Sequence, residues 1–120
     1  MGHPEVLRPL RHAAYGADKM GKSTLFSSPR LLVGINAFEP GQSHALHTHH
    51  GMDKVYYVLE GQGVFLLDGA ELPMHAGDML VAPDGVPHGV GNTGEARLAV
   101  LVVLAPGDHA AVAVRTALAV

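Results

Sequence analysis

The chain lacks cysteine and tryptophan altogether, and only 5% of its 120 residues are aromatic, so its core must be filled by Val, Leu, Ala and Ile. The absence of cysteine excludes a disulfide framework, a thiolate metal site and a cysteine nucleophile. The sequence also lacks any run of lysine and arginine, and its formal net charge is only −3. We therefore expect no nucleic-acid partner and no basic membrane-binding face, which favours small-molecule chemistry.

Long hydrophobic runs are also missing. No segment approaches the roughly 18 consecutive apolar residues of a membrane span. The first residues, Met1 to Glu5, show no basic region followed by an apolar stretch of the kind that directs export. We expect a soluble, cytoplasmic protein with no membrane contact.

The length of the chain predicts one domain, and its 15 glycines and 8 prolines divide it into short segments. Residues 1–30 are irregular and are expected to form an arm that packs on the barrel or on a partner chain. Residues 31–105 alternate short apolar runs with turn signals, at the spacing typical of sandwiches and barrels. Residues 106–120 form a tail, for which a short helix and a final strand both remain open. The expected strands include 31–35, 55–59, 64–67, 71–74, 79–82 and 98–104.

One stretch satisfies a phosphate-binding pattern. Residues Gly16 to Ser23 match G-x4-G-K-[S/T], the P-loop signature. That chemistry needs a buried strand before the loop and a helix after it, so that backbone N–H groups face the phosphates. Neither is expected here. Residues 10–15 do not read as a buried strand, and Pro29 would end any helix that began after Ser23. We interpret the match as a chance arrangement in the arm.

Histidines cluster between residues 44 and 50. His47 and His49 stand two apart, so on a strand their imidazoles would leave the same face and could reach one ion. His44 and His50 have the opposite parity and are expected to point away. Such a pair is weak evidence by itself, because it is also found on solvated edge strands, and a third ligand from a distant strand would strengthen it.

The spacing around this pair resembles the first motif of the cupin family, G-x5-H-x-H-x(3,4)-E-x6-G. The chain offers Gly41, His47, His49, Lys54 and Gly61 at the motif's intervals. The one departure is Lys54, which stands where the motif has glutamate.

The second cupin motif, G-x5-P-x-G-x2-H-x3-N, follows without a departure in spacing. Its positions are filled by Gly77, Pro83, Gly85, His88 and Asn92. Together the two motifs cover residues 41–92 in the family's order. The chain is therefore similar to small single-domain cupins.

This resemblance implies an all-β double-stranded β-helix, or jelly-roll barrel, with a metal ion near one end of its cavity. It carries the role of metal ligand over to His47, His49 and His88. Three imidazoles suit a divalent transition metal, Fe, Mn, Ni, Cu or Zn, and leave open positions for water or a ligand. Loss of the metal from a vestigial site is the alternative. His75 and His109 have no partner at ligand spacing and are expected to be structural or surface residues.

Two residues beside the expected site could act in catalysis. Lys54 and Tyr56 should share the inner face of their strand, although Tyr56 is expected mainly as a pocket wall. A bulge at the start of this strand could instead turn Asp53 inward as a fourth ligand. With a regular strand, Asp53 points outward and the Lys54 ammonium should reach the cavity mouth or an acidic partner.

The fold does not determine the activity, since cupins include dioxygenases, isomerases, decarboxylases and binding domains. We expect a metal-binding barrel that holds a small organic ligand. The alternative is a metal-dependent enzyme, dioxygenase-like in the first instance, acting on a small organic substrate. The family resemblance and the apolar residues of the arm also predict a homodimer.

Overall fold

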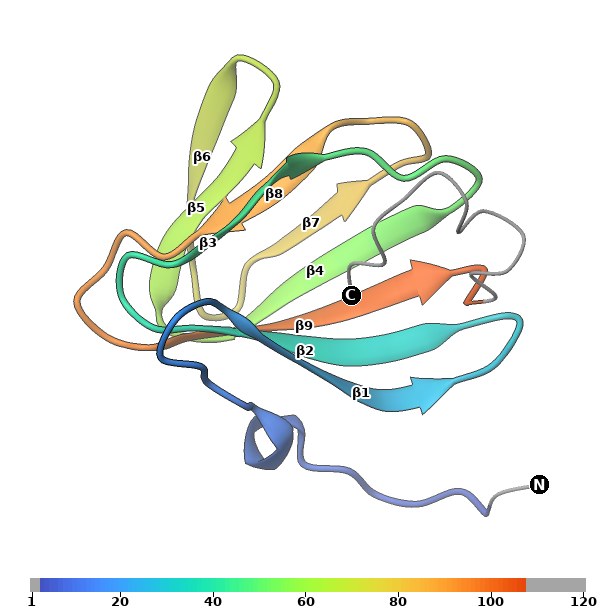
Figure 1. Ribbon diagram of the computed structural model, residues 1–120. Coiled ribbons are helices and arrows are strands. Elements are labelled where there is room, and N and C mark those ends of the chain that lie inside the picture. Colours follow the sequence, from blue (N-terminus) through green and yellow to red (C-terminus); the bar gives the residue numbers. More distant parts are fainter. Residues whose placement is uncertain (1–2, 108–120) are drawn as a thin grey trace.

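The computed structural model of the chain describes residues 3–107. These residues form nine strands in two antiparallel sheets that face each other, and the jelly-roll barrel expected from the sequence is confirmed (Figure 1). The larger sheet has the order β1 (Gly21–Ser27), β2 (Leu32–Phe38), β9 (Leu98–Ala105), β4 (Asp53–Glu60), β7 (Met79–Ala82). The smaller sheet has the order β3 (Ser43–His47), β8 (His88–Gly91), β5 (Gln62–Leu67), β6 (Ala70–His75).

Strand β4 runs through the middle of the molecule and sorts its side chains by parity. Lys54, Tyr56 and Val58 are buried, whereas Asp53 and Tyr57 are exposed. Successive side chains of a strand leave opposite faces, so one face of β4 lines the interior. This confirms that Lys54 and Tyr56 share the inner face.

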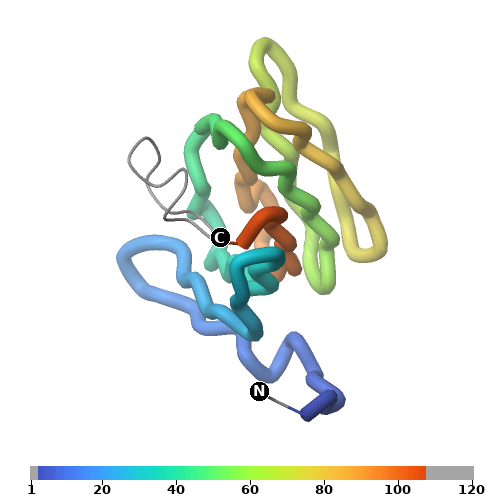
Figure 2. The backbone as a smooth tube through the Cα atoms, turned by 90° about the vertical axis from the view of Figure 1, so that its right-hand side faces the viewer, coloured from blue at the N-terminus to red at the C-terminus, as the bar shows by residue number. Residues whose placement is uncertain are grey.

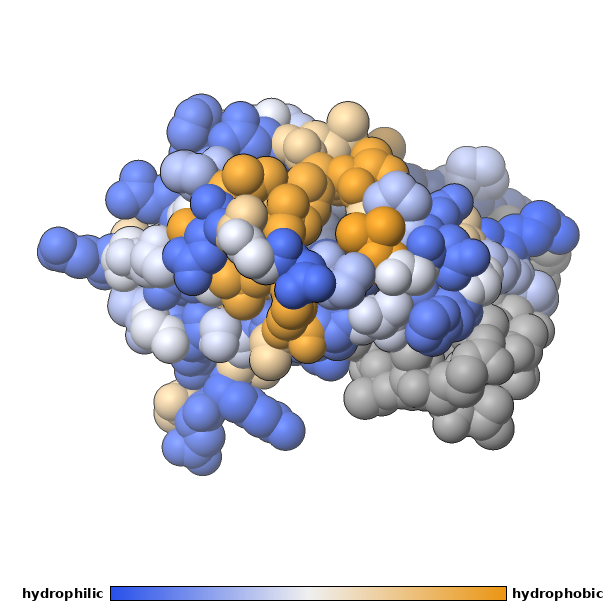
Figure 3. Space-filling view, turned by 90° about the horizontal axis from the view of Figure 1, so that it is seen from above, coloured by the Kyte–Doolittle hydropathy of each residue, from blue (hydrophilic) through white to orange (hydrophobic). Residues whose placement is uncertain are grey.

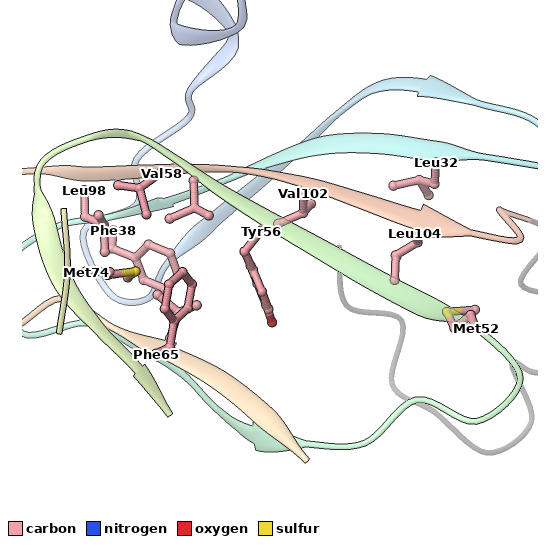
Figure 4. Close-up of a cluster of buried hydrophobic side chains, with 12 residues drawn as sticks. Leu32, Phe38, Met52, Tyr56, Val58, Phe65, Met74, Leu98, Val102 and Leu104 are labelled. Atoms are coloured by element: carbon pink, nitrogen blue, oxygen red, sulfur yellow. The ribbon is translucent and has the colours of Figure 1, made fainter. Parts of the chain in front are cut away.

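The apolar core fills the space between the sheets and is densest at one end (Figure 4). Phe38, Phe65 and Leu98 gather there, whereas Tyr56 lies further along β4 with its hydroxyl directed away from the strand into the interior. Burial of side chains this large contributes about 2 kcal/mol each. The packed end therefore anchors the barrel and leaves the polar interior to the other end.

The turn between β4 and β5 requires glycine. Gly61 has φ of +88°, and a Cβ at this position would overlap the carbonyl oxygen of Arg97. Only glycine adopts such a φ without strain and also allows another backbone to approach this closely. The glycine that closes the first motif therefore has a structural reason.

The first 30 residues contain more regular structure than expected. A single turn of 3-10 helix, η1, covers Pro9–His12, and β1 covers Gly21–Ser27 and pairs with β2. The prediction of an irregular arm is therefore wrong for β1. Only Leu25 and Phe26 are apolar in this strand, so hydrophobicity gave no signal, and pairing with β2 orders it. Figure 2 shows the segment before β1 on the outside of the barrel, where part of it lines a pocket with Phe26 of β1.

Among residues 3–107, no helix is long and apolar enough to cross a membrane. Strands β3 and β6 of the smaller sheet expose Leu46 and Leu72. Figure 3 shows an orange, apolar area on the face of the molecule that is seen from above. The predicted tail, from Asp108 onward, and His109 lie outside the described residues.

Candidate metal centre

Three histidines converge at the end of the barrel away from the packed core. His47 is the last residue of β3 and lies opposite His88, the first residue of β8, while His49 follows two residues after the strand has ended. One ligand nitrogen of each ring lies within 4.8 Å of the other two. The ring centroids of His47 and His88 are 4.4 Å apart, and that of His49 is 5.0 Å from His47. The structure thus brings together the three residues predicted as metal ligands.

Backbone carbonyls hold two of these rings in one tautomer. The Nδ1 atom of His47 lies 2.7 Å from the carbonyl oxygen of Ala45, and Nδ1 of His88 lies 2.7 Å from that of Val86. A carbonyl oxygen can only accept, so each Nδ1 must carry the hydrogen and donate it. The Nε2 atoms of both rings are left as buried acceptors with no hydrogen-bond partner among the described residues. This is how proteins orient imidazole ligands toward a metal ion.

The surroundings also keep these imidazoles neutral. Burial lowers the pKa of His47 to about 4, outweighing the hydrogen bond to Ala45, and the Lys54 charge lowers it further. Burial likewise lowers the pKa of His88. Because only a neutral imidazole has a lone pair for a metal, both residues are prepared to bind one at neutral pH.

The prediction that His44 points away from the site is wrong. Its ring stacks on that of His47, with the centroids 4.2 Å apart. The pairing of β3 with β8 shifts register between His44 and His47, and one extra residue in a strand reverses the parity of what precedes it. Burial, followed by the proximity of His47, lowers the pKa of His44 to about 2. His44 is therefore a neutral wall of the site, whereas His50 is exposed as predicted.

Lys54 lies in the interior, and no acidic side chain among the described residues pairs with it. Its side chain is fully buried, and Nζ has no hydrogen-bond partner within residues 3–107 and lies 4.7 Å from the centroid of the Tyr56 ring. The expectation that its ammonium reaches the cavity mouth or a carboxylate is therefore wrong. Burial, with a smaller contribution from Lys22, lowers the pKa of Lys54 to about 7. The regular path of β4 causes this, because it turns the lysine stem inward.

Tyr56 lies between Lys54 and the histidine cluster in the interior. Its ring centroid lies 5.8 Å from that of His88, and its buried hydroxyl has no hydrogen-bond partner within residues 3–107. Burial raises the pKa of this hydroxyl, so it stays protonated and can donate a hydrogen bond. Tyr56 thus lies in the interior next to the histidine cluster, and its role as a pocket wall stays a prediction.

Asp53 lies on the opposite face of β4 from this cluster. It is exposed, and its carboxylate accepts a hydrogen bond of 2.8 Å from the backbone N–H of Asp84. The pairing of β4 with β9 is regular from Asp53 to Val58, so the bulge that would turn Asp53 inward is not formed. The geometry gives Asp53 a role in positioning the neighbouring loop.

The segment that matches the P-loop pattern does not form one. Lys22 and Ser23 belong to β1, and no helix follows them in the described part of the chain. However, Lys19 and Lys22 line a pocket with Ser43 and His44 beside the histidine cluster. Neither lysine was predicted to be functional, because the P-loop match that contains them was interpreted as a chance arrangement. Their sole signal was that the chain has only three lysines, and Lys54 is the third.

Comparison with known proteins agrees with this arrangement. Residues 34–104 match the model of the cupin domain family. The chain belongs to the cupin family. This cupin is 35% identical to an oxalate-binding protein of Thermotoga maritima over 88 residues, covering 73% of this chain and 72% of that protein. A crystal structure of a protein from Thermus thermophilus has 41% identity and a TM-score of 0.81, with 86% of this chain and 98% of that chain covered.

An enzyme is also among the relatives of this cupin. A gentisate 1,2-dioxygenase of Ralstonia is 29% identical over 96 residues. The alignment covers 79% of this chain but only 25% of that protein. The similarity is therefore to one part of a much longer chain.

Proposed function

We propose that this cupin binds a divalent transition metal ion through His47, His49 and His88, and that the metal and Lys54 together hold a small organic carboxylate. The observation that carries this proposal is the convergence of the three ligand nitrogens within 4.8 Å, with two rings fixed by carbonyl acceptors. The buried Nε2 atoms of His47 and His88 would be costly to leave unpaired unless an ion occupied the site.

The donor set fits Fe, Mn, Ni, Cu or Zn, all of which accept imidazole nitrogen. When bound, such an ion supplies a Lewis acid with open positions for an anionic oxygen. Because Lys54 replaces the family's glutamate, the converging set of described residues offers three neutral donors and no carboxylate. The charge of the ion is then left for a ligand to balance.

Lys54 favours an anionic ligand for the same reason. A protonated lysine and a dication in one interior repel each other, and an anion between them attracts both. A carboxylate also supplies the acceptors that Lys54 Nζ and the Tyr56 hydroxyl lack among the described residues. The oxalate-binding relative supports this ligand class.

Calorimetric titration with oxalate tests the proposal, using protein stripped of metal and protein reloaded with Mn²⁺ or Zn²⁺. Oxalate should bind only the metal-loaded protein, and acetate should bind the metal-loaded protein more weakly than oxalate does. Lys54→Met should retain the metal but lose about tenfold in oxalate affinity, since a charge-assisted hydrogen bond disappears. Equal oxalate binding with and without metal would refute the proposal.

Catalysis by the same site is the second candidate, favoured by the gentisate 1,2-dioxygenase relative. A dioxygenase-like activity would use Lys54 or Tyr56 to position or protonate the substrate, and isomerase or decarboxylase chemistry would place the same demand on them. Oxygen uptake by the Fe²⁺-loaded protein with gentisate as the probe separates the two functions. Uptake abolished by Tyr56→Phe would favour the enzyme, and no uptake favours the binding protein.

We also propose that the protein is a homodimer, as expected from the sequence. The exposed Val6, at 80% accessibility, and Phe26, at 51%, offer apolar surface on the arm and on the edge strand β1. Light scattering should give twice the chain mass at micromolar concentration. A monomer would contradict the proposal. The cytoplasmic location stays a prediction.

A further inference from the structure

Lys19, Met20, Lys22, Ser43 and His44 line a pocket of about 430 Å³. Its polar lining consists of two lysines, a serine hydroxyl and a histidine, and no acidic side chain among the described residues contributes to it. The segment before β1 and the start of that strand supply one side of the pocket, and the start of β3 supplies the other. A cavity lined in this way is complementary to an anion.

This pocket adjoins the metal centre. His44 belongs to the pocket lining and also stacks on His47 at 4.2 Å, so a single imidazole separates the two. Lys22 is close enough to depress the pKa of Lys54 through its charge. The pocket and the metal centre thus share the wall that the His44 ring forms.

The three lysines, out of eight lysines and arginines in the chain, gather in one region. The chain carries a net charge of −3 and has only three lysines, and two of them line this pocket while the third lies in the interior beside it. Burial, together with the neighbouring Lys19, lowers the pKa of Lys22. Gathering like charges against that repulsion costs free energy, and an anionic group in the pocket offsets the cost.

The inner face of β2 offers an independent observation. Asn36 lies directly opposite Lys22 in the pairing of β1 with β2, so the two side chains share the inner face. Asn36 is fully buried, and neither atom of its amide has a hydrogen-bond partner within residues 3–107. Asn36 does not line the pocket itself, but its amide is an unsatisfied polar group directly opposite Lys22, which does.

We propose that this pocket holds the second anionic group of an organic ligand whose first carboxylate lies at the metal, so that the preferred ligand is an elongated dicarboxylate. The far anionic group of the ligand is bound by the ammonium groups of Lys19 and Lys22 and by the Ser43 hydroxyl. The His44 ring packs along the part of the ligand that joins its two anionic groups. This inference rests on the proposed function, because the near end of the ligand requires the metal.

The first test uses the metal-free protein and inorganic phosphate as the probe. In an NMR titration, the backbone amides of Lys22, Ser43 and His44 should shift with saturation, and Lys22→Met should abolish the shifts. Arg30→Met removes an exposed cation that does not line the pocket and should leave them unchanged. Shifts that do not saturate, or that persist in Lys22→Met, would overturn the proposal whether or not the protein binds metal.

The second test uses the metal-loaded protein and pairs of acids matched in length: valerate with glutarate, hexanoate with adipate, and heptanoate with pimelate. At least one dicarboxylate should bind about tenfold more tightly than its partner, and Lys22→Met should remove this preference while metal content and monocarboxylate affinity stay unchanged. Equal affinities throughout would overturn the second subsite. Metal content measured on the same samples shows whether the metal centre itself has failed.

Discussion

The ammonium nitrogen of Lys54 lies 4.7 Å from the centroid of the Tyr56 ring, in an interior where both side chains are fully buried. The face of an aromatic ring attracts a cation, but in a desolvated site this offsets only about 2 kcal/mol. That is less than burial of an ammonium without a carboxylate costs, which is why the pKa of Lys54 falls to about 7. The pair therefore makes this end of the barrel sensitive to pH and receptive to anions.

The first prediction concerns the stability of the metal-free protein. The pKa of Lys54 is about 7 when folded and ordinary, near 10.4, when unfolded, so the unfolded state binds more protons between these values. The free energy of unfolding should therefore rise with pH across this window, and the contribution of neutral Lys54 should be lost as pH falls toward 7.

Lys54→Met measures this contribution directly. The variant should be more stable than the original at pH 7, by on the order of 3 kcal/mol, and the difference should shrink as pH rises to about 9. Urea unfolding of both metal-free proteins at the two pH values checks this result. A difference that stays constant with pH would show that Lys54 does not change its protonation on folding.

Tyr56→Phe tests the unpartnered hydroxyl. Because the Tyr56 oxygen is buried without a hydrogen-bond partner among the described residues, its removal should leave the unfolding free energy of the metal-free protein unchanged or raise it by about 1 kcal/mol. Metal content should not change. A loss of more than about 1 kcal/mol would reveal a hydrogen bond that the structure does not show.

Exchange of Lys54 for the family's glutamate should strengthen metal binding. Lys54→Glu replaces a repelling cation with an oxygen ligand on the inner face, and affinity for Mn²⁺ should increase about tenfold or more, about 1.4 kcal/mol. Asp53→Ala is the matched control, because Asp53 is exposed on the opposite face. It should not change the affinity. A large loss of metal from Asp53→Ala would instead establish Asp53 as the fourth ligand.

A pair of glycine substitutions tests the turn that closes the first motif. Gly61 and Gly69 have nearly the same φ, +88° and +81°, but a Cβ at Gly69 meets nothing within 4 Å. Gly69→Ala should cost about 1 kcal/mol of unfolding free energy from backbone strain alone. Gly61→Ala should cost at least about 2 kcal/mol more, because its Cβ would overlap the Arg97 backbone. Equal losses would contradict the close approach.

Much of the architecture could be predicted from local signals. The apolar runs of β4, β7 and β9 alternate or persist at strand length, and Asp68-Gly69, a dipeptide typical of two-residue hairpin turns, forms the turn between β5 and β6. Asp-Gly favours a type I′ turn, in which both central residues have positive φ. Only Gly69 has a positive φ here, so the turn is of another type. Residue type predicts where this turn lies, but it does not predict the backbone conformation of the turn.

The features that could not be predicted all depend on pairing between distant segments. The register shift of β3 against β8 reverses the orientation of His44. No residue type in this segment predicts such a shift. Strand β1 is mostly polar and forms because β2 is available to pair with it. Lys54 is buried without a carboxylate because no described strand or loop packed around it places an acidic side chain beside its Nζ. The sequence around Lys54 does not show which distant residues will surround it.

Metal stoichiometry, measured by equilibrium dialysis with elemental analysis, tests most directly whether His47, His49 and His88 hold one divalent ion. The original protein should bind one ion per chain at neutral pH, and His47→Ala, His49→Ala and His88→Ala should each lose most of it. His44→Ala, which alters a ring stacked on His47 that lies outside the converging set, should keep full stoichiometry. Undiminished metal in the three ligand variants, or equal loss in His44→Ala, would contradict the three-histidine site.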